Sequence, residues 1–341
     1  MSKSKPAPLP PGTVIGGYRI TRLLAAGGFG LVYHARDGEG REVAIKEYLP
    51  TTLVERAPGE LTPTVLPSKL PLYRLGLRGF FEEGRALAQI SHRAVVSVLN
   101  FFRENDTVYM VMEYLRGDPL QAFILTARER QRKKVLREAT IRSLFDEVLR
   151  GLRIVHQHKM LHLDIKPSNL FITDDNRVVL IDFGAARNVL DTEGGFVRPM
   201  YTPGFAAPEM YRRTRGEGFG PWTDIYAIGA CIYSCMRGYP PHEATQRQEK
   251  DRLDESLMRL RGAYSDHLID IVRWCMALDP LSRPQSVFAL QRELAHERAD
   301  ADAAPSGWWD RLRSRLGTSS ADGASDADRR PGERSSFLQA K

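Results

Sequence analysis

The sequence predicts an α+β protein in two lobes, a β-rich N-lobe followed by a helical C-lobe. Strand-like segments separated by glycine-containing turns dominate from about residue 15 to residue 115. After about Gly117 the character changes to helices, with helical spacing of apolar residues over 140–157, 223–236 and 265–278 and two strand-like segments at 170–172 and 178–181. Strands collected in one half of a chain and helices in the other are typical of an α+β architecture.

Composition narrows the class of protein. The chain has 341 residues, of which 42% are hydrophobic, so it can bury a large core. No apolar run reaches the roughly 18 residues that span a bilayer. The N-terminal segment lacks the apolar core of a signal peptide, and Ser2 stands where a myristoylation signal has glycine. Three cysteines are an odd number, which argues against a disulfide framework. We therefore expect a cytoplasmic protein without a transmembrane segment.

The formal net charge of +7 does not by itself indicate a nucleic-acid partner. Much of the positive charge lies in the segment 128–134 and at Arg137, without interleaved aromatic residues. Such a segment is typical of a solvated helical face, so we expect no nucleic-acid binding.

The N-lobe elements follow from local patterns. Residues 1–14 are rich in proline and lysine and are predicted to form a disordered lead. Three strands are expected between Tyr18 and Lys46. Residues 50–78 contain several prolines and no clear period, which predicts a long loop. A helix is expected over 81–90, followed by strands centred on 98–102 and 108–113.

The C-lobe elements are helices predicted over 140–157, 223–236 and 265–278. Residues 298–341 are rich in Ala, Asp, Ser, Gly and Arg, which predicts a mostly disordered tail. Within it, a short basic amphipathic helix is expected at 306–316. This helix contains Trp308 and Trp309, and packing on the body or on a partner is favoured over membrane binding.

A glycine-rich turn and a buried lysine are the first chemical signals. Glycines between two strands let backbone amides approach phosphates, although hairpins use glycine for conformational reasons as well. The third strand ends at Lys46, and a buried ammonium group needs partners such as phosphate oxygens and a carboxylate. Glu83 on the following helix is the candidate carboxylate, with Glu82 as the competing assignment.

The segment 162–169 carries the strongest signal. It places Asp164, Lys166 and Asn169 on one loop, and Asp182 follows after a strand pair. Phosphoryl transfer needs a positioned hydroxyl, bridging metal ions and positive charge on the transferred group. Asp164 is suited to orient the hydroxyl, Lys166 to supply the positive charge, and the oxygens of Asn169 and Asp182 to bind Mg²⁺.

These motifs identify a family resemblance. The sequence resembles the eukaryotic-like protein kinases, and in particular their bacterial serine/threonine branch. The resemblance covers about residues 17–296 and rests on five motifs in order along the chain: GlyGlyPheGly, ValAlaIleLys, HisLeuAspIleLysProSerAsn, AspPheGly and AlaProGlu.

The resemblance implies an ATP- and Mg²⁺-dependent serine/threonine protein kinase that uses protein substrates. It implies a domain over 15–297, with an N-lobe of about 15–115 and a C-lobe of about 116–297. It also implies a buried ion pair between Glu209 and Arg283, and support of the catalytic loop by Asp224. The implied catalytic residues are Asp164, Lys166, Lys46, Glu83 and Thr202, and the implied metal ligands are Asn169 and Asp182. The implied nucleotide-binding residues are Gly27, Gly28, Phe29, Gly30, Val32, Ala44, Lys46, Met112 (the gatekeeper), Glu113 and Leu115.

Two residues depart from the family pattern. Ala25 replaces the first glycine of the turn, which implies a modest loss of ATP affinity. Leu163 stands where most members have the arginine that pairs with an activation-loop phosphate. We therefore expect activity that does not depend on phosphorylation of that loop, for example at Thr192.

Two other functions compete with this one. A pseudokinase scaffold is one alternative, and a small-molecule phosphotransferase is the weaker one, because AlaProGlu is present. Partner docking is expected at the 50–78 loop, the basic 124–140 insert or the tryptophans of the tail.

Overall fold

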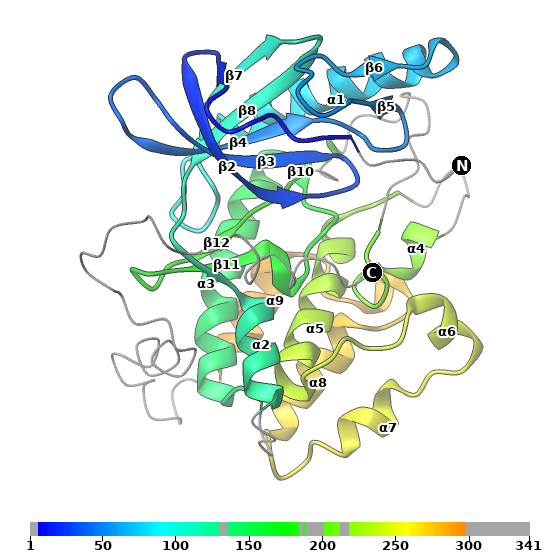
Figure 1. The fold of residues 1–341 in the computed structure, drawn as a ribbon. Coiled ribbons are helices and arrows are strands. Elements are labelled where there is room, and N and C mark those ends of the chain that lie inside the picture. Colours follow the sequence, from blue (N-terminus) through cyan, green and yellow to red (C-terminus); the bar gives the residue numbers. More distant parts are fainter. Residues whose placement is uncertain (1–5, 130–134, 184–186, 189–200, 212–217, 297–341) are drawn as a thin grey trace.

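The computed structural model describes residues 6–129, 135–183, 187–188, 201–211 and 218–296. Strands form the upper lobe in Figure 1 and helices form most of the lower lobe. The predicted α+β class and two-lobed arrangement are therefore confirmed.

The N-lobe is built on a six-stranded antiparallel sheet with the order β1-β2-β3-β4-β8-β7. Only the pairing of β4 with β8 joins strands that are distant in sequence. The strands of this sheet are β1 (Val14–Ile15), β2 (Tyr18–Ala26), β3 (Gly30–Arg36), β4 (Glu42–Tyr48), β7 (Val98–Glu104) and β8 (Thr107–Glu113).

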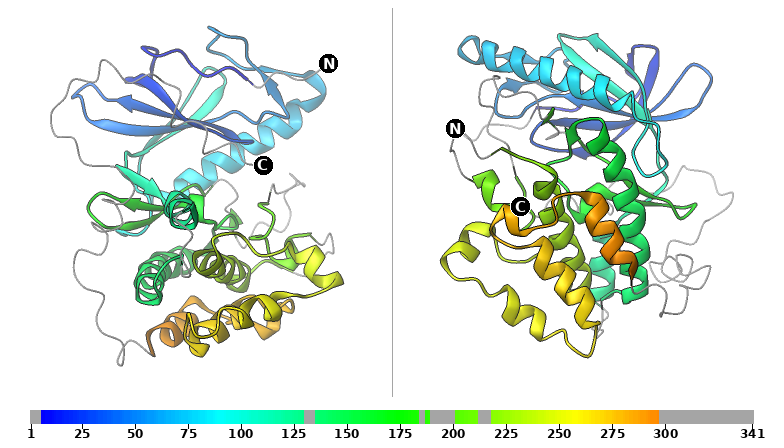
Figure 2. Two further views of the ribbon diagram at one scale, coloured as in Figure 1. Left: turned by 60° about the horizontal axis from the view of Figure 1, so that its bottom comes forward. Right: turned by 180° about the vertical axis from the view of Figure 1, so that it is seen from behind.

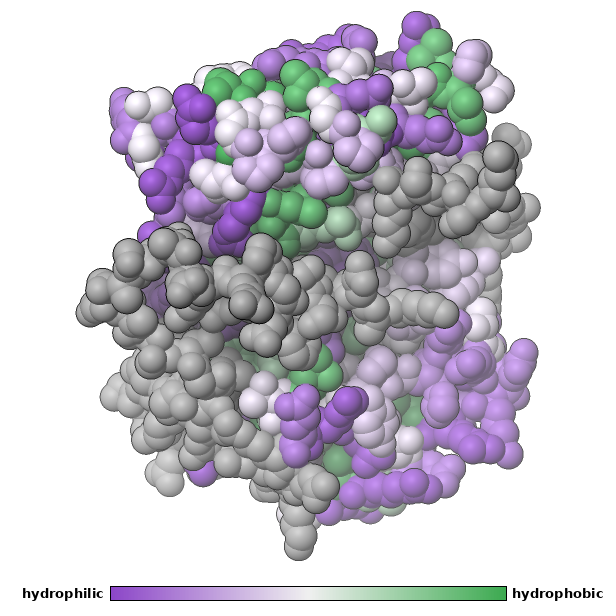
Figure 3. Space-filling model, viewed as in Figure 1, coloured by the Kyte–Doolittle hydropathy of each residue, from purple (hydrophilic) through white to green (hydrophobic). Residues whose placement is uncertain are grey.

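The register of this sheet decides which side chains share a face. Val32 lies opposite Lys46, and Ala44 lies opposite Met112. Because side chains alternate along a strand, these four residues lie on one face of the sheet. Glu47 of β4 lies on the other face. In Figure 3, apolar side chains reach the surface between the lobes, beneath this sheet.

The predicted loop over 50–78 is wrong for much of its length. A hairpin of β5 (Val54–Glu55) and β6 (Thr64–Val65) and a 3₁₀ turn η1 (Pro67–Lys69) precede a long helix, α1 (Leu70–Leu87). The helix therefore begins well before residue 81, and it ends at Leu87 rather than residue 90. Seen from behind, α1 runs along the N-lobe above the helices of the C-lobe (Figure 2).

Glycines and a proline conceal α1 in the sequence. Pro71 lies in the first turn, where no intrahelical N–H bond is needed. Gly76 lies against Tyr48: a Cβ at Gly76 would come within 1.8 Å of the Tyr48 hydroxyl oxygen. Tyr73, Phe80 and Leu87 carry the buried face.

The prediction that residues 1–14 form a disordered lead is wrong for residues 6–14. Leu9 is buried in the core, and its backbone N–H donates a hydrogen bond to the Tyr33 hydroxyl at 3.1 Å. The N–H of Ala7 donates to the carbonyl oxygen of Arg56 at 2.9 Å. Apolar burial and these bonds order a segment whose composition alone suggests disorder. Residues 1–5 lie outside the described part of the chain.

The C-lobe is arranged around helix α5, which is buried from Thr223 to Met236. The predicted helices are present, and the one expected over 265–278 ends earlier, at Cys275. The helices of this lobe are α2 (Leu120–Glu129), α3 (Glu138–Gln157), α4 (Pro208–Tyr211), α5 (Pro221–Arg237), α6 (Ala244–Glu249), α7 (Leu253–Met258), α8 (Asp266–Cys275) and α9 (Val287–His296).

Short strands flank the loops that lie near the boundary of the two lobes. A three-stranded sheet has the order β12-β11-β9, and β10 pairs with β13. The remaining elements are β9 (Gly117–Pro119), β10 (Met160–Leu161), η2 (Pro167–Asn169), β11 (Leu170–Thr173), β12 (Val178–Leu180), β13 (Arg187–Asn188) and η3 (Pro280–Ser282).

Some predicted features lie in parts of the chain that the structure does not describe. Residues 130–134 of the basic insert, Thr192, and the tail with Trp308 and Trp309 lie outside the described residues. The three cysteines are buried and unpaired. Among the helices described, none has the length and apolar character needed to cross a membrane.

Candidate active site

The segment that follows β10, as far as the end of η2, brings three of the predicted residues together with a fourth from a distant segment. Lys166 Nζ lies 2.7 Å from Asp164 Oδ2. Thr202 Oγ1 donates a hydrogen bond to Asp164 Oδ1 at 3.0 Å and accepts one from Lys166 Nζ at 3.0 Å. Asn169 Nδ2 donates to the backbone oxygen of Asp164 at 2.8 Å and to Oδ2 at 3.0 Å. The Asp164 carboxylate is therefore held by three side chains.

Lys46 joins the two lobes. Its Nζ lies 2.8 Å from Asp182 Oδ1 and 3.8 Å from Glu83 Oε1. Glu83 is buried on α1, whereas Glu82 is exposed, so Glu83 is the carboxylate that faces the lysine. The predicted pair of Lys46 and Glu83 is present, but the closer partner of Lys46 is Asp182.

Burial and charge shift the ionisation of this cluster. Burial alone would lower the pKa of Lys46, but the carboxylates of Asp182 and Glu83 outweigh it and raise the pKa. The positive charge of Lys46 lowers the pKa of Asp182 to about 2. Burial raises the pKa of Glu83 to about 8, with Lys46 opposing the shift. Lys46 and Asp182 are therefore both charged at neutral pH.

The glycine-rich turn closes the end of the β2–β3 hairpin. Gly27 N–H donates to the carbonyl oxygen of Gly30 at 2.9 Å. A Cβ at Gly30 would lie 1.9 Å from the carbonyl oxygen of Glu47, so the close approach of β3 to β4 at this point requires glycine. Ala25 pairs with Val32 within β2 and β3, a strand position that tolerates a side chain.

The face of the sheet toward the C-lobe carries the residues expected to contact a nucleobase. The side chains of Val32, Ala44, Met112 and Leu115 are half-buried. Glu113 ends β8, and its backbone N–H donates to Ser97 O at 3.0 Å while its carboxylate accepts from Ser97 N at 2.9 Å. The segment from Glu113 to Leu115 is thereby fixed where the chain passes between the lobes.

Asp224 on α5 supports the loop from below. Its carboxylate accepts hydrogen bonds from the backbone N–H groups of His162 at 2.9 Å and Leu163 at 2.8 Å. Leu163 has a φ of 60°, a conformation that is costly for a leucine and that these bonds help to maintain. His156 Nε2 lies 2.8 Å from the same carboxylate. No sequence pattern indicates a role for His156, because its partner Asp224 lies on another helix.

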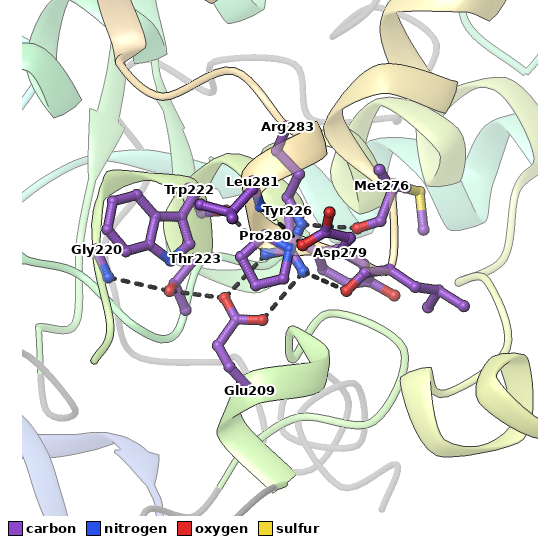
Figure 4. Close-up of polar contacts among 12 residues, drawn as sticks. Glu209, Gly220, Trp222, Thr223, Tyr226, Met276, Asp279, Pro280, Leu281 and Arg283 are labelled. Carbon is purple, nitrogen blue, oxygen red and sulfur yellow. Dashed lines mark hydrogen bonds and ion pairs between the residues drawn. The ribbon is translucent and has the colours of Figure 1, made fainter. Parts of the chain in front are cut away.

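The predicted ion pair between Glu209 and Arg283 is present and fully buried. Arg283 Nη1 lies 2.8 Å from Glu209 Oε1, and Arg283 Nη2 lies 3.0 Å from Oε2. Figure 4 shows that Thr223 also contacts this carboxylate, with its hydroxyl 2.8 Å away. The pair connects the segment that contains Thr202 to the end of the C-lobe.

The residues present fit a nucleotide with a divalent cation. Both hydrogen bonds that hold Asn169 use its amide nitrogen, so its amide oxygen is the end that can face a cation. The Asp182 side chain is 48% exposed, and the oxygens of Asn169 and Asp182 are the hard donors that Mg²⁺ prefers. Lys46 and the glycine-rich turn add a positive charge and accessible backbone.

Comparison with known proteins defines the family. Residues 18–295 match the model of the protein kinase domain, which is most of the chain. The chain belongs to the protein kinase domain family.

Individual relatives agree with this assignment. The chain is 31% identical over 238 residues to the serine/threonine-protein kinase PknA of Mycobacterium tuberculosis, covering 67% of this chain and 48% of PknA. It is 28% identical to the putative CBL-interacting protein kinase 13 of Oryza sativa, covering 85% of this chain and 52% of that protein. The chain thus spans about half the length of these relatives. A solved structure described as PpkA-294 apo form has 34% identity and a TM-score of 0.69, and the match covers 86% of this chain and 100% of that one.

Proposed function

We propose that this chain is an ATP-dependent kinase that phosphorylates serine and threonine side chains of proteins. The observation that carries the proposal is the contact set of Asp164, Lys166 and Thr202, in which one carboxylate is bonded to both an ammonium group and a hydroxyl. This set lies beside Asn169 and across the site from Lys46 and Asp182.

Each side chain has a distinct task in this proposal. Asp164 accepts the proton of the substrate hydroxyl or orients that hydroxyl, and Thr202 and Lys166 hold its carboxylate in one position. Lys166 places positive charge where the phosphoryl group is transferred. Asn169 and Asp182 would hold Mg²⁺, and Lys46, which lies between Asp182 and Glu83, would hold phosphate oxygens. When bound, MgATP supplies the transferred phosphoryl group and the charge of the metal.

The acceptor is proposed to be serine or threonine because Lys166 occupies the space beside Asp164. A short Ser or Thr side chain leaves room for this lysine at the phosphate. The segment from Thr202 to Glu209, which the ion pair with Arg283 anchors, supports a protein acceptor over a metabolite.

Independence from an activation-loop phosphate is part of the proposal. Leu163 is 6% exposed and lines a small cavity with Phe205 and Met210. An apolar side chain at this position provides no charge or hydrogen-bond donor to a phosphate.

The proposed requirement for ATP and the three unpaired cysteines favour a cytoplasmic location.

The intact mass of the protein after incubation with MgATP tests this proposal, with Asp164→Ala as the control. Mass gains in steps of one phosphate, absent from the control, are expected, and mapping should place them on Ser or Thr. If the protein modifies neither itself nor casein, the pseudokinase alternative replaces the proposal. Phosphate transfer to metabolites but not to casein supports the small-molecule alternative.

A further inference from the structure

The face of the N-lobe sheet that points away from the C-lobe contains a fully buried ion pair. The side chains of Arg56 and Glu47 are both 0% exposed. Arg56 Nη1 donates to Glu47 Oε1 at 2.5 Å and Nη2 donates to Oε2 at 2.8 Å, a two-bond geometry that is specific to arginine. A buried pair of this kind is stable only when its remaining hydrogen-bonding groups are satisfied.

Four further hydrogen-bonding groups satisfy this pair. The hydroxyls of Tyr33 and Tyr109 donate to the Glu47 carboxylate at 2.8 and 2.9 Å. Arg56 Nε donates to the carbonyl oxygen of Ala7 at 2.8 Å, and its Nη1 lies 3.3 Å from that of Leu61. The pair therefore joins β3, β4, β8, the β5–β6 hairpin and the N-terminal segment.

The chain between the two charged residues contacts the glycine-rich turn. We call residues Leu49–Leu53 the β4–β5 connection. The N–H of Leu49 donates to the carbonyl oxygen of Phe29 at 2.9 Å, and the N–H of Thr51 donates to that of Gly28 at 3.1 Å. These two bonds use carbonyl oxygens of the turn, so they do not occupy the N–H groups with which such a turn binds phosphate.

The ion pair fixes both ends of the β4–β5 connection. Glu47 belongs to β4, and its carbonyl oxygen is also the atom that approaches Gly30. Arg56 directly follows β5. Because both ends are held, the connection loses little further conformational entropy when its N–H groups bond the turn.

We propose that Arg56 is a positioning residue for nucleotide binding, which acts by holding the β4–β5 connection against the glycine-rich turn. This inference rests on the proposed kinase function, because it assumes that the turn binds the phosphates of ATP. The ordering of the turn itself does not depend on that assumption.

Thr51→Pro is the sharpest test, because it removes one N–H group. The N–H of Leu53 donates to the carbonyl oxygen of Pro50 at 2.9 Å, so Thr51 lies at the second position of a turn, where proline is well tolerated. Thr51→Ala is the matched control, because it keeps the N–H and removes only the hydroxyl, whose contact with the same Gly28 oxygen is long, at 3.5 Å. We expect Thr51→Pro to weaken MgATP binding by about three- to tenfold, measured calorimetrically without acceptor, and Thr51→Ala to change it less than about twofold.

Variants of Arg56 test the ion pair. Arg56→Gln is expected to weaken MgATP binding by about tenfold, and Arg56→Lys, which keeps the charge but not the two-bond geometry, by less. Arg247→Gln is the control for general damage. Arg247 is also buried, but its partners Tyr226, Asp251 and Met276 lie in the C-lobe. The Arg247→Gln variant should have a lower thermal midpoint of unfolding and an unchanged dissociation constant for MgATP.

Hydrogen exchange supplies a readout that needs no nucleotide. Amides of residues 27–31 should exchange about threefold faster or more in Thr51→Pro and Arg56→Gln than in the wild type. Unchanged exchange and unchanged MgATP affinity in both variants would overturn the inference. So would an Arg247→Gln variant whose MgATP binding is weakened as much as that of Arg56→Gln. A wild type that binds no MgATP contradicts the proposed function instead, and the exchange rates then decide the role of Arg56.

Discussion

The hydroxyl of Thr202 donates a hydrogen bond to the carboxylate of Asp164 at 3.0 Å, although the two residues are 38 positions apart. This bond links the segment before α4 to the loop that carries the proposed catalytic carboxylate. Because Lys166 also bonds the same hydroxyl, the orientation of Asp164 depends on how that segment is placed. The position of the segment before α4 therefore determines whether Asp164 is oriented for catalysis.

Replacing Thr202 tests this coupling. Thr202→Val keeps nearly the same shape and removes the hydroxyl, so Asp164 and Lys166 lose their shared partner. We expect kcat to fall by about 10- to 100-fold while the dissociation constant of MgATP is unchanged. Thr202→Ser keeps the hydroxyl and should recover most of the rate. Equal rates for the Val and Ser variants would show that the hydroxyl does not position Asp164.

The pH dependence of stability should report the contact between Lys46 and Asp182. The usual pKa of the Asp182 carboxyl is 3.8, and Lys46 lowers it to about 2. A carboxyl group with a lowered folded-state pKa contributes stability above its unfolded pKa and loses it as the pH falls through the folded pKa. Asp182→Asn should therefore lose less stability than the wild type as the pH falls from about 5 toward 2.

Urea unfolding midpoints between pH 6 and pH 3 measure this difference. Glu39→Gln is a suitable control, because the Glu39 side chain is 76% exposed and remote from Lys46. Its pH dependence should match that of the wild type. The prediction is contradicted if Asp182→Asn follows the wild-type curve throughout this range.

The buried pair of Glu209 and Arg283 should matter far more for stability than an exposed pair. Their side chains are 1% and 0% exposed, so Arg283→Met leaves a buried carboxylate without its counter-ion. We expect a loss of about 3–5 kcal/mol in the free energy of unfolding. Arg259→Met removes the partner of Glu255 in a pair whose side chains are 65% and 61% exposed, and should cost less than about 1 kcal/mol. Comparable losses in the two variants, measured by urea unfolding, would refute this.

The structure brings the predicted polar residues together because most of them lie on one short segment with fixed spacing. Asp164, Lys166 and Asn169 are separated by only a few positions, so the loop that carries one carries all three. The pair of Glu209 and Arg283 is distant in sequence, and only the family resemblance indicated it.

What the sequence could not predict depends on tertiary packing. The helical period of α1 is interrupted by Pro71 and Gly76. The need for glycine at position 76 is visible only in the fold, where Tyr48 packs against it. The N-terminal segment is proline-rich, and nothing local indicates that Leu9 enters the core. Arg56 reads as an ordinary loop arginine until Glu47 is known to point away from the cleft.

Leu163 leads to a prediction about regulation. A phosphate on the activation loop controls a site through charge-assisted hydrogen bonds to a cation, and the side chain at position 163, next to Asp164, offers none. Leu163 is buried and apolar, and its backbone N–H is bonded to Asp224 at 2.8 Å. We therefore expect Asp224 to hold the loop conformation at this position without a phosphate.

Phosphatase treatment and Thr192→Ala should accordingly leave the initial rate of protein phosphorylation within about twofold of the untreated wild type, because the position where a phosphate would be bound offers no charge to it. Thr202→Val is the contrasting variant, since it acts on Asp164 directly and should lose the rate under the same conditions. Loss of activity in Thr192→Ala, together with a phosphate mapped to Thr192 in the active wild type, would mean that a cation other than a residue at position 163 binds the loop phosphate. The time course of the phosphatase-treated protein distinguishes the two possibilities. A phosphate-dependent enzyme regains activity only after a lag in which it phosphorylates itself. An enzyme whose loop conformation is held by Asp224 starts at its full rate.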